Sequence, residues 1–115
     1  MAARGEAGVS KFVKVAGVGD IASGVCKKVV VDGQRVALYN VEGEFYATDD
    51  TCSHAEASLS EGELDGHEAI CPLHGARFDV RTGRALSLPA VTPIDTYIVR
   101  VEGNDVLVSL EHSHG

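Results

Sequence analysis

Two short pairs of cysteine and histidine carry the side chains in this sequence that are best suited to chemistry. The first pair is Cys52-Ser53-His54, the second is Cys71-Pro72-Leu73-His74, and sixteen residues separate His54 from Cys71. Thiolate and imidazole are ligands that zinc, iron and copper accept. Because two such loops can close on one site, the sequence predicts a metal centre held by all four of these side chains.

The spacing within each pair distinguishes between the kinds of metal site. Zinc fingers place Cys with Cys and His with His, at Cys-x(2–4)-Cys and His-x(3–5)-His. Here each loop is mixed, one residue separates Cys52 from His54, and Gly75 directly follows His74. This pattern resembles the Rieske motif, Cys-x-His…Cys-x-x-His. The likeness to a Rieske-type ferredoxin is close over residues 52–83 and looser over most of the chain.

The resemblance implies one [2Fe–2S] cluster, with Cys52 and Cys71 on one iron and His54 and His74 on the other, at the solvent-facing end. Two Fe³⁺, two sulfides and two thiolates sum to zero charge, whereas four thiolates would give −2. The less negative site accepts an electron more readily. The resemblance therefore implies a one-electron carrier of an aromatic-ring dioxygenase system, and not an enzyme. Its partners would be a flavin- or NAD(P)H-linked ferredoxin reductase and a terminal oxygenase.

Four positions depart from the respiratory Rieske pattern. The respiratory proteins carry an extra cysteine in each loop, where this chain has Ala57 and Leu73. They also place a serine and a tyrosine, whose hydroxyls donate to sulfur, where this chain has Ala76 and Phe78. Fewer hydrogen-bond donors leave an added electron less stabilised, so we expect a low reduction potential.

Two other functions use the same residues. One is the small Rieske-like subunit of an assimilatory nitrite reductase, and the other is a zinc-held interaction module. Outside the four ligands, Cys26 lies in an apolar β segment and is expected to be a buried, inert thiol. His67 is expected at the surface. Pro89 and Pro93 fit either a rigid flap over the cluster or an ordinary edge loop.

Composition limits the alternatives further. The net charge of −7 on 115 residues argues against nucleic-acid binding as the main task. The chain has no apolar run of about 18 residues, so no membrane span is expected. The N-terminus lacks the apolar segment of a secretion signal, so we expect a cytoplasmic protein. We also expect a monomer, and the odd count of three cysteines does not suggest a disulfide framework.

The negative charge is concentrated around the cysteine and histidine pairs. Seven acidic residues and no Lys or Arg lie between Asp49 and Ala76, while the rest of the chain has ten acids and ten bases. Such a run is either a docking face for a basic partner or a solvated surface. The seven are Asp49, Asp50, Glu56, Glu61, Glu63, Asp65 and Glu68.

Short β segments joined by glycine turns must position these loops. An all-β domain of stacked antiparallel sheets is expected, with a small cluster-binding lobe over about 48–86 and frayed tails at 1–10 and 111–115. Residues 1–115 would form one Rieske domain. Asp32-Gly33 is a strong hairpin signal, and residues 49–66 fit a loop or a short helix. Strands are expected at 12–16, 25–31, 34–40, 44–48, 68–71, 77–80, 96–101 and 106–110.

Overall fold

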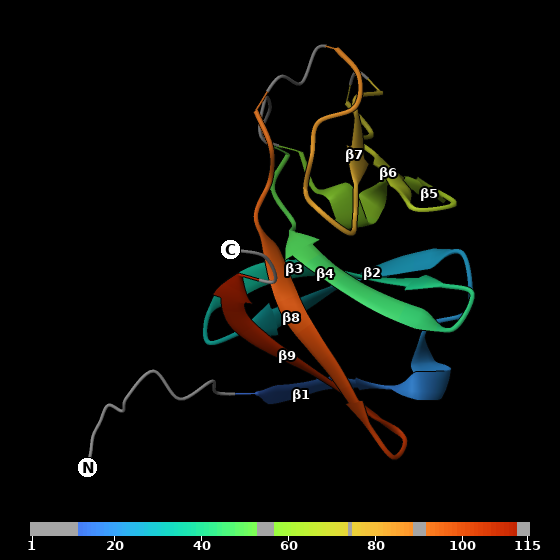
Figure 1. Cartoon of the computed structure of the whole chain (residues 1–115), viewed down its shortest axis with the longest axis vertical. Helices are drawn as coiled ribbons and strands as arrows, with labels where there is room; N and C mark the ends of the chain where they lie inside the picture. Colours follow the sequence, from blue (N-terminus) through green and yellow to red (C-terminus); the bar gives the residue numbers. More distant parts are fainter. Residues whose placement is uncertain (1–11, 53–56, 74, 89–91, 113–115) are drawn as a thin grey trace.

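The computed structural model of the chain describes residues 12–52, 57–73, 75–88 and 92–112 (Figure 1). This part of the chain is built almost entirely from short antiparallel strands, with two single-turn 3-10 helices between them. In chain order the elements are β1 (Val13–Gly17), η1 (Val18–Asp20), β2 (Val25–Val31), β3 (Gln34–Val41), β4 (Glu44–Asp49), η2 (Leu59–Glu61), β5 (Glu63–Asp65), β6 (Glu68–Ile70), β7 (Arg77–Asp79), β8 (Thr96–Glu102) and β9 (Asp105–His112).

The larger sheet has six strands in the order β1-β9-β8-β4-β3-β2, and all neighbours are antiparallel. The edge strands β1 and β2 contact each other, so the sheet curls toward a closed barrel. Two-residue turns close its hairpins. In the Asp32-Gly33 turn both residues have positive φ, 50° and 83°. A type I′ hairpin turn requires this backbone, which confirms the turn expected at that dipeptide.

The smaller sheet has three strands in the order β5-β6-β7 and lies over one side of the larger sheet (Figure 1). It is reached from β4 through η2 and is left through the segment that leads to β8. We call the described residues between Asp50 and Leu88 the small lobe. Both predicted ligand pairs fall within this part of the sequence.

Strand β3 separates two hydrophobic cores. Because side chains alternate along a strand, Val36 and Leu38 point into the curled sheet, while Ala37 and Tyr39 point toward the small lobe. All four side chains are fully buried. The run Val36-Ala37-Leu38-Tyr39 is therefore continuously apolar because both faces of β3 are covered. The core that contains Ala37 and Tyr39 packs β3 against the small lobe.

The fold class is confirmed, while three local expectations need correction. Strand β5 and helix η1 form where we expected no regular element or only a loop. Strand β9 extends to His112, paired with Tyr97, so residues 111 and 112 are not part of a frayed tail. Residues 1–10 and Pro89 lie outside the described part of the chain.

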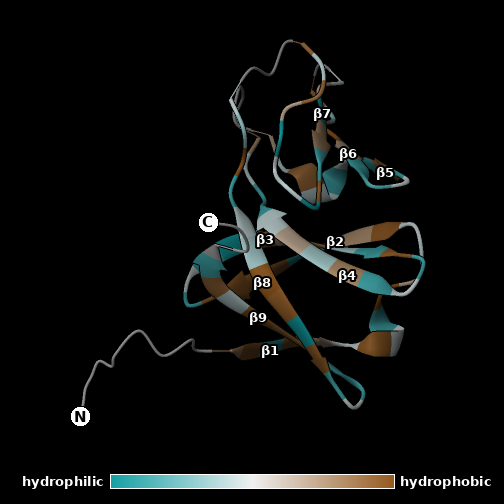
Figure 2. Ribbon diagram, in the orientation of Figure 1, coloured by the Kyte–Doolittle hydropathy of each residue, from teal (hydrophilic) through white to brown (hydrophobic). Residues whose placement is uncertain are grey.

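Hydropathy follows the strands and turns. Hydrophobic residues recur along β2, β8 and β9, and the turn between β8 and β9 is hydrophilic (Figure 2). In the described residues, no helix has the length and apolar character needed to cross a membrane.

Candidate metal centre

The two cysteine loops are closed by the same backbone hydrogen bond. The N–H of Cys52 donates to the carbonyl of Ala57 at 2.9 Å, and the N–H of Cys71 donates to the carbonyl of Ala76 at 2.8 Å. Each bond joins a cysteine to the fifth residue after it. The two loops therefore have equal length at their necks, although the histidines are two and three residues after their cysteines.

Each neck has a further restraint. In the first loop, Thr51 and Ser58 form an isolated antiparallel bridge just outside the Cys52–Ala57 bond. In the second, the N–H of Gly75 donates to the carbonyl of Cys71 at 3.1 Å. Gly75 has φ 76°, a left-handed conformation that glycine adopts without strain. The glycine noted beside His74 thus acts through the backbone, as a turn residue.

Both cysteines meet the requirements for holding an iron–sulfur cluster. Cys52 and Cys71 are 3 % and 1 % exposed, share the core beneath the small lobe, and are not in disulfides. Thiolate is the ligand that iron–sulfur clusters take. Two buried thiols presented from matched loops fit a [2Fe–2S] group, and the buried position would keep water from its sulfur ligands.

His54 and His74 lie outside the described residues, as do Ser53 and Glu56. In the part of the chain that the structure describes, no group of three metal-binding side chains is formed. The fold therefore brings the two predicted cysteine ligands into one core, and the assignment of the two histidines stays a prediction.

Asp50 positions the first cysteine loop, although the sequence pattern places it among the surface acids. Its side chain is fully buried. Its carbonyl accepts from the N–H of Leu59 at 2.7 Å, and its Oδ1 accepts from the N–H of Ser60 at 2.9 Å. Among the described residues its Oδ2 has no hydrogen-bond partner. Asp50 thus fixes the first ligand loop to η2, and nothing in the sequence separates it from Asp49.

Cys26 links the larger sheet to the small lobe. Its side chain is half-buried on β2, and its Sγ lies 3.4 Å from the carbonyl oxygen of Ser60. Burial raises the pKa of the Cys26 thiol, and the negative charge of Asp50 raises it further. A raised pKa lowers the fraction of thiolate, the reactive form of the side chain. The expectation of a buried thiol needs correction, because Cys26 is only half-buried.

The four positions that depart from the respiratory pattern are all described. Ala57 is partly buried, Leu73 is 46 % exposed, and no cysteine of the chain forms a disulfide. Ala76 and Phe78 are fully buried in the same core as Cys52 and Cys71. Neither side chain carries a hydroxyl, so neither can donate a hydrogen bond to sulfur in this core.

The acidic face is smaller than the sequence suggests. Arg77, one residue beyond the acidic run, lies 3.1 Å from Asp65 and 3.0 Å from Glu68. With Asp50 buried, the exposed acids of the run without an ion pair among the described residues are Glu61 and Glu63. His67, expected at the surface, is half-buried with its ring edge-on to Tyr46, at 5.6 Å between centroids.

Family comparisons define the class of protein. The family model described as "Rieske [2Fe-2S] domain" matches residues 11–98. This chain belongs to the Rieske [2Fe–2S] family, among the ferredoxins of ring-hydroxylating dioxygenase systems. It is an electron carrier with one [2Fe–2S] cluster and does not itself catalyse a reaction.

This chain matches two curated relatives over nearly the whole length of each. The ferredoxin component of the naphthalene 1,2-dioxygenase system of Pseudomonas aeruginosa is 47 % identical over 87 % of this chain and 96 % of its own length. The ferredoxin component of biphenyl 2,3-dioxygenase of Rhodococcus jostii (strain RHA1) is 48 % identical over 87 % of this chain and 94 % of its own.

A solved structure supports the same placement. A ferredoxin in a complex of reduced oxygenase and oxidized ferredoxin in carbazole 1,9a-dioxygenase matches with a TM-score of 0.86 and 39 % identity. The match covers 93 % of this chain and 100 % of that one. A putative nitrite reductase small subunit matches with a TM-score of 0.74 and 26 % identity, over 85 % of this chain and 97 % of that one.

Proposed function

We propose that this chain receives one electron from a ferredoxin reductase and passes it to a terminal ring-hydroxylating oxygenase. The observation that carries the proposal is the pair of matched loops, each closed by a Cys N–H bond, that places Cys52 and Cys71 in one core. Cys52, His54, Cys71 and His74 would hold the cluster. The likeness of this chain to a ferredoxin whose structure was solved in complex with an oxygenase supports the oxygenase as a partner.

The cluster, when bound, supplies one reversible one-electron step. The chain's own residues hold the site and shape its surroundings. Asp50 and the Thr51–Ser58 bridge fix the first loop, while Gly75 and the Cys71–Ala76 bond fix the second. Rigid loops keep the change in geometry between the two redox states small. The exposed Leu73, one residue before His74, lies on the surface that a partner would contact.

The aromatic substrate binds to the oxygenase, so the sequence of this carrier does not determine which substrate is oxidised. Relatives from a naphthalene and a biphenyl system are nearly equally similar, at 47 % and 48 % identity. A carrier that touches only protein partners has no pocket for the substrate to select. The surface of the terminal oxygenase, rather than its substrate, therefore determines the specificity of this chain.

A reconstituted electron-transfer assay tests the proposal. A flavin reductase with NADH or NADPH, this chain and a terminal oxygenase of the naphthalene or biphenyl type are combined with the aromatic substrate. Product should form only when this chain is present, and its cluster should be reduced and reoxidised during turnover. Product formation that does not depend on this chain would contradict the proposal. So would tight co-purification of the chain with a sirohaem protein, which would favour the nitrite reductase subunit.

A further inference from the structure

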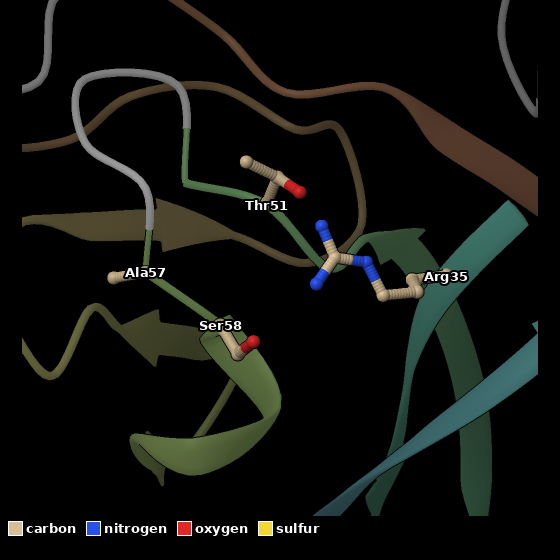
Figure 3. Close-up of a pocket in the computed structure, with 4 residues that line it drawn as sticks. All are labelled: Arg35, Thr51, Ala57 and Ser58. Atoms are coloured by element: carbon tan, nitrogen blue, oxygen red, sulfur yellow. The ribbon is translucent and has the colours of Figure 1, made fainter.

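An arginine projects into a pocket at the neck of the first cysteine loop. The pocket holds about 400 Å³ and is lined by Arg35, Thr51, Ala57 and Ser58. Figure 3 shows the guanidinium of Arg35 turned toward Thr51 and Ser58, with both hydroxyl oxygens on the side that faces it. The pocket therefore presents a cation and two hydroxyl groups directly beside Cys52.

The charge of Arg35 is not used inside the described structure. Arg77, Arg81 and Arg100 each lie within 3.3 Å of a carboxylate oxygen. Arg84, in the turn after β7, has no ion pair among the described residues, but it does not line the pocket. In the described residues, Arg35 has no acidic partner within 4 Å, although the chain carries a net charge of −7. An unpaired guanidinium among so many acids is available to a carboxylate from outside.

The backbone fixes the point from which the exposed Arg35 side chain enters the pocket. The carbonyl of Arg35 accepts from the N–H of Asp50 at 3.4 Å, which joins the start of β3 to the segment leading into the loop. Arg35 is on the same face of β3 as Ala37 and Tyr39, the face that packs against the small lobe. Its cross-strand partner Val30 is 57 % exposed. The cation thus sits beside an exposed apolar side chain.

We propose that this pocket binds a carboxylate side chain of the terminal oxygenase when the two proteins dock. The proposal rests on the proposed function. A guanidinium offers two parallel N–H donors that match a carboxylate, and the hydroxyls of Thr51 and Ser58 can donate to its remaining lone pairs. A partner that reads Glu61 and Glu63 with basic groups would also need an acid opposite Arg35. Glu61 and Glu63 line a separate pocket with Cys71 and Gly75 of the second cysteine loop. Opposite charges at the two loops would therefore fix the rotation of the carrier on the oxygenase.

The test compares the wild type with Arg35→Gln, Arg35→Lys and Arg100→Gln, bound to the oxygenase that the wild type reduces in the reconstituted assay. Kd and dissociation rate are measured by biolayer interferometry, and midpoint potential by redox titration. Arg35→Gln should weaken Kd about tenfold, mainly through faster dissociation. Arg35→Lys should lose most of the same affinity, because an ammonium group cannot form the paired bonds. Arg100→Gln, an equal charge change on β8, should alter Kd less than about twofold.

Several outcomes would contradict the binding of an oxygenase carboxylate in this pocket and would leave the proposed function intact. An Arg35→Gln variant that binds like the wild type would do so. An Arg35→Lys variant that dissociates from the oxygenase at the wild-type rate would show that Arg35 contributes only its charge and no paired hydrogen bonds. A lowered midpoint potential at unchanged Kd would assign Arg35 to the cluster instead. Failure of the wild type to reduce any terminal oxygenase would instead contradict the proposed function.

Discussion

At the scale of single residues, the account depends on which side chains bind the cluster. The Cys52 and Cys71 side chains are buried in one core, so water does not compete with them for binding iron. Replacing either with Ser should lose the cluster or much of the fold, because metal binding and folding are coupled. Replacing His54 or His74 with Cys should make an assembled cluster more negative and lower its midpoint potential.

Redox titration of the His54→Cys and His74→Cys variants measures the midpoint potential and tests the predicted decrease. His67→Cys is the matched control, since His67 packs on Tyr46 and is not a predicted ligand. It should leave the potential unchanged. An intact cluster of unshifted potential in His74→Cys would show that His74 is not a ligand.

Two apolar residues of the same core should tune the potential. Ala76 and Phe78 are fully buried and stand where respiratory Rieske proteins carry hydroxyls. The wild-type midpoint should therefore lie near the low end of the Rieske range, roughly −150 mV. Ala76→Ser and Phe78→Tyr should raise it by supplying hydrogen bonds to sulfur. A wild-type value above about +100 mV, high in the same range, would contradict this reasoning.

At the scale of elements, the turn after β7 attaches the small lobe to the chain that enters β8. Gly83 in this turn is buried with φ 80°, and its carbonyl accepts from the N–H of Ile94 at 2.9 Å. A Cβ at Gly83 would overlap the carbonyl oxygen of Ile94. Gly83→Ala should therefore lower the free energy of unfolding by roughly 2–4 kcal/mol.

Gly33→Ala is the control for that substitution. Gly33 in the β2–β3 turn has nearly the same backbone, φ 83°, but nothing lies within 4 Å of an added Cβ. Only backbone strain is added there, about 1 kcal/mol. Thermal unfolding followed by circular dichroism and by the visible absorbance of the cluster compares the two. Equal unfolding temperatures for Gly83→Ala and Gly33→Ala would show that the overlap with the carbonyl oxygen of Ile94 does not destabilise the fold.

The elements also show how far sequence reasoning reaches. Strands of five or more residues were predictable because alternation and Gly turns mark them, as at Asp32-Gly33. The equally short strands β6 and β7 were also predicted, but β5 was not, because its pairing with β6 depends on a close approach at Gly62. A Cβ at Gly62 would overlap the carbonyl oxygen of Ile70. That contact is tertiary and leaves no local signal.

The same division holds at the site. Ligand spacing predicted that Cys52 and Cys71 would come together, because metal chemistry restricts both residue type and separation, and both lie in one core. That they bind the cluster stays a prediction. The burial of Asp50 was not predictable, since Asp49 and Asp50 are identical in type and adjacent in sequence. Strand alternation places Asp49 on the same face as Ala47, where it is half-buried, while the N–H groups of η2 hold Asp50 in the interior.

At the scale of the whole molecule, negative charge should speed encounter with at least one partner. Glu61 and Glu63 remain exposed after Asp50, Asp65 and Glu68 are accounted for. Electron transfer should slow as ionic strength rises from about 0.01 to 0.15 M, where the Debye length falls from about 30 to 8 Å. Neutralising Glu56, Glu61 and Glu63 together should lower the association rate and flatten the salt dependence.

Stopped-flow rates at several salt concentrations measure this effect. A matched control neutralises Glu42, Glu44 and Glu102, three exposed acids in the β3–β4 turn, at the start of β4 and at the end of β8. The control should keep the wild-type salt dependence, and the cluster spectrum should be unchanged in both. Rates that ignore salt would leave apolar contact around Leu73 as the docking force.

The central claim is that this chain carries an electron on a cluster with mixed cysteine and histidine ligands. The most direct measurement combines metal and sulfide analysis with electron paramagnetic resonance of the dithionite-reduced protein. The account predicts two irons and two acid-labile sulfides per chain, and a rhombic signal whose average g lies below that of four-cysteine clusters. One zinc without sulfide, or the average g of an all-cysteine cluster, would contradict it.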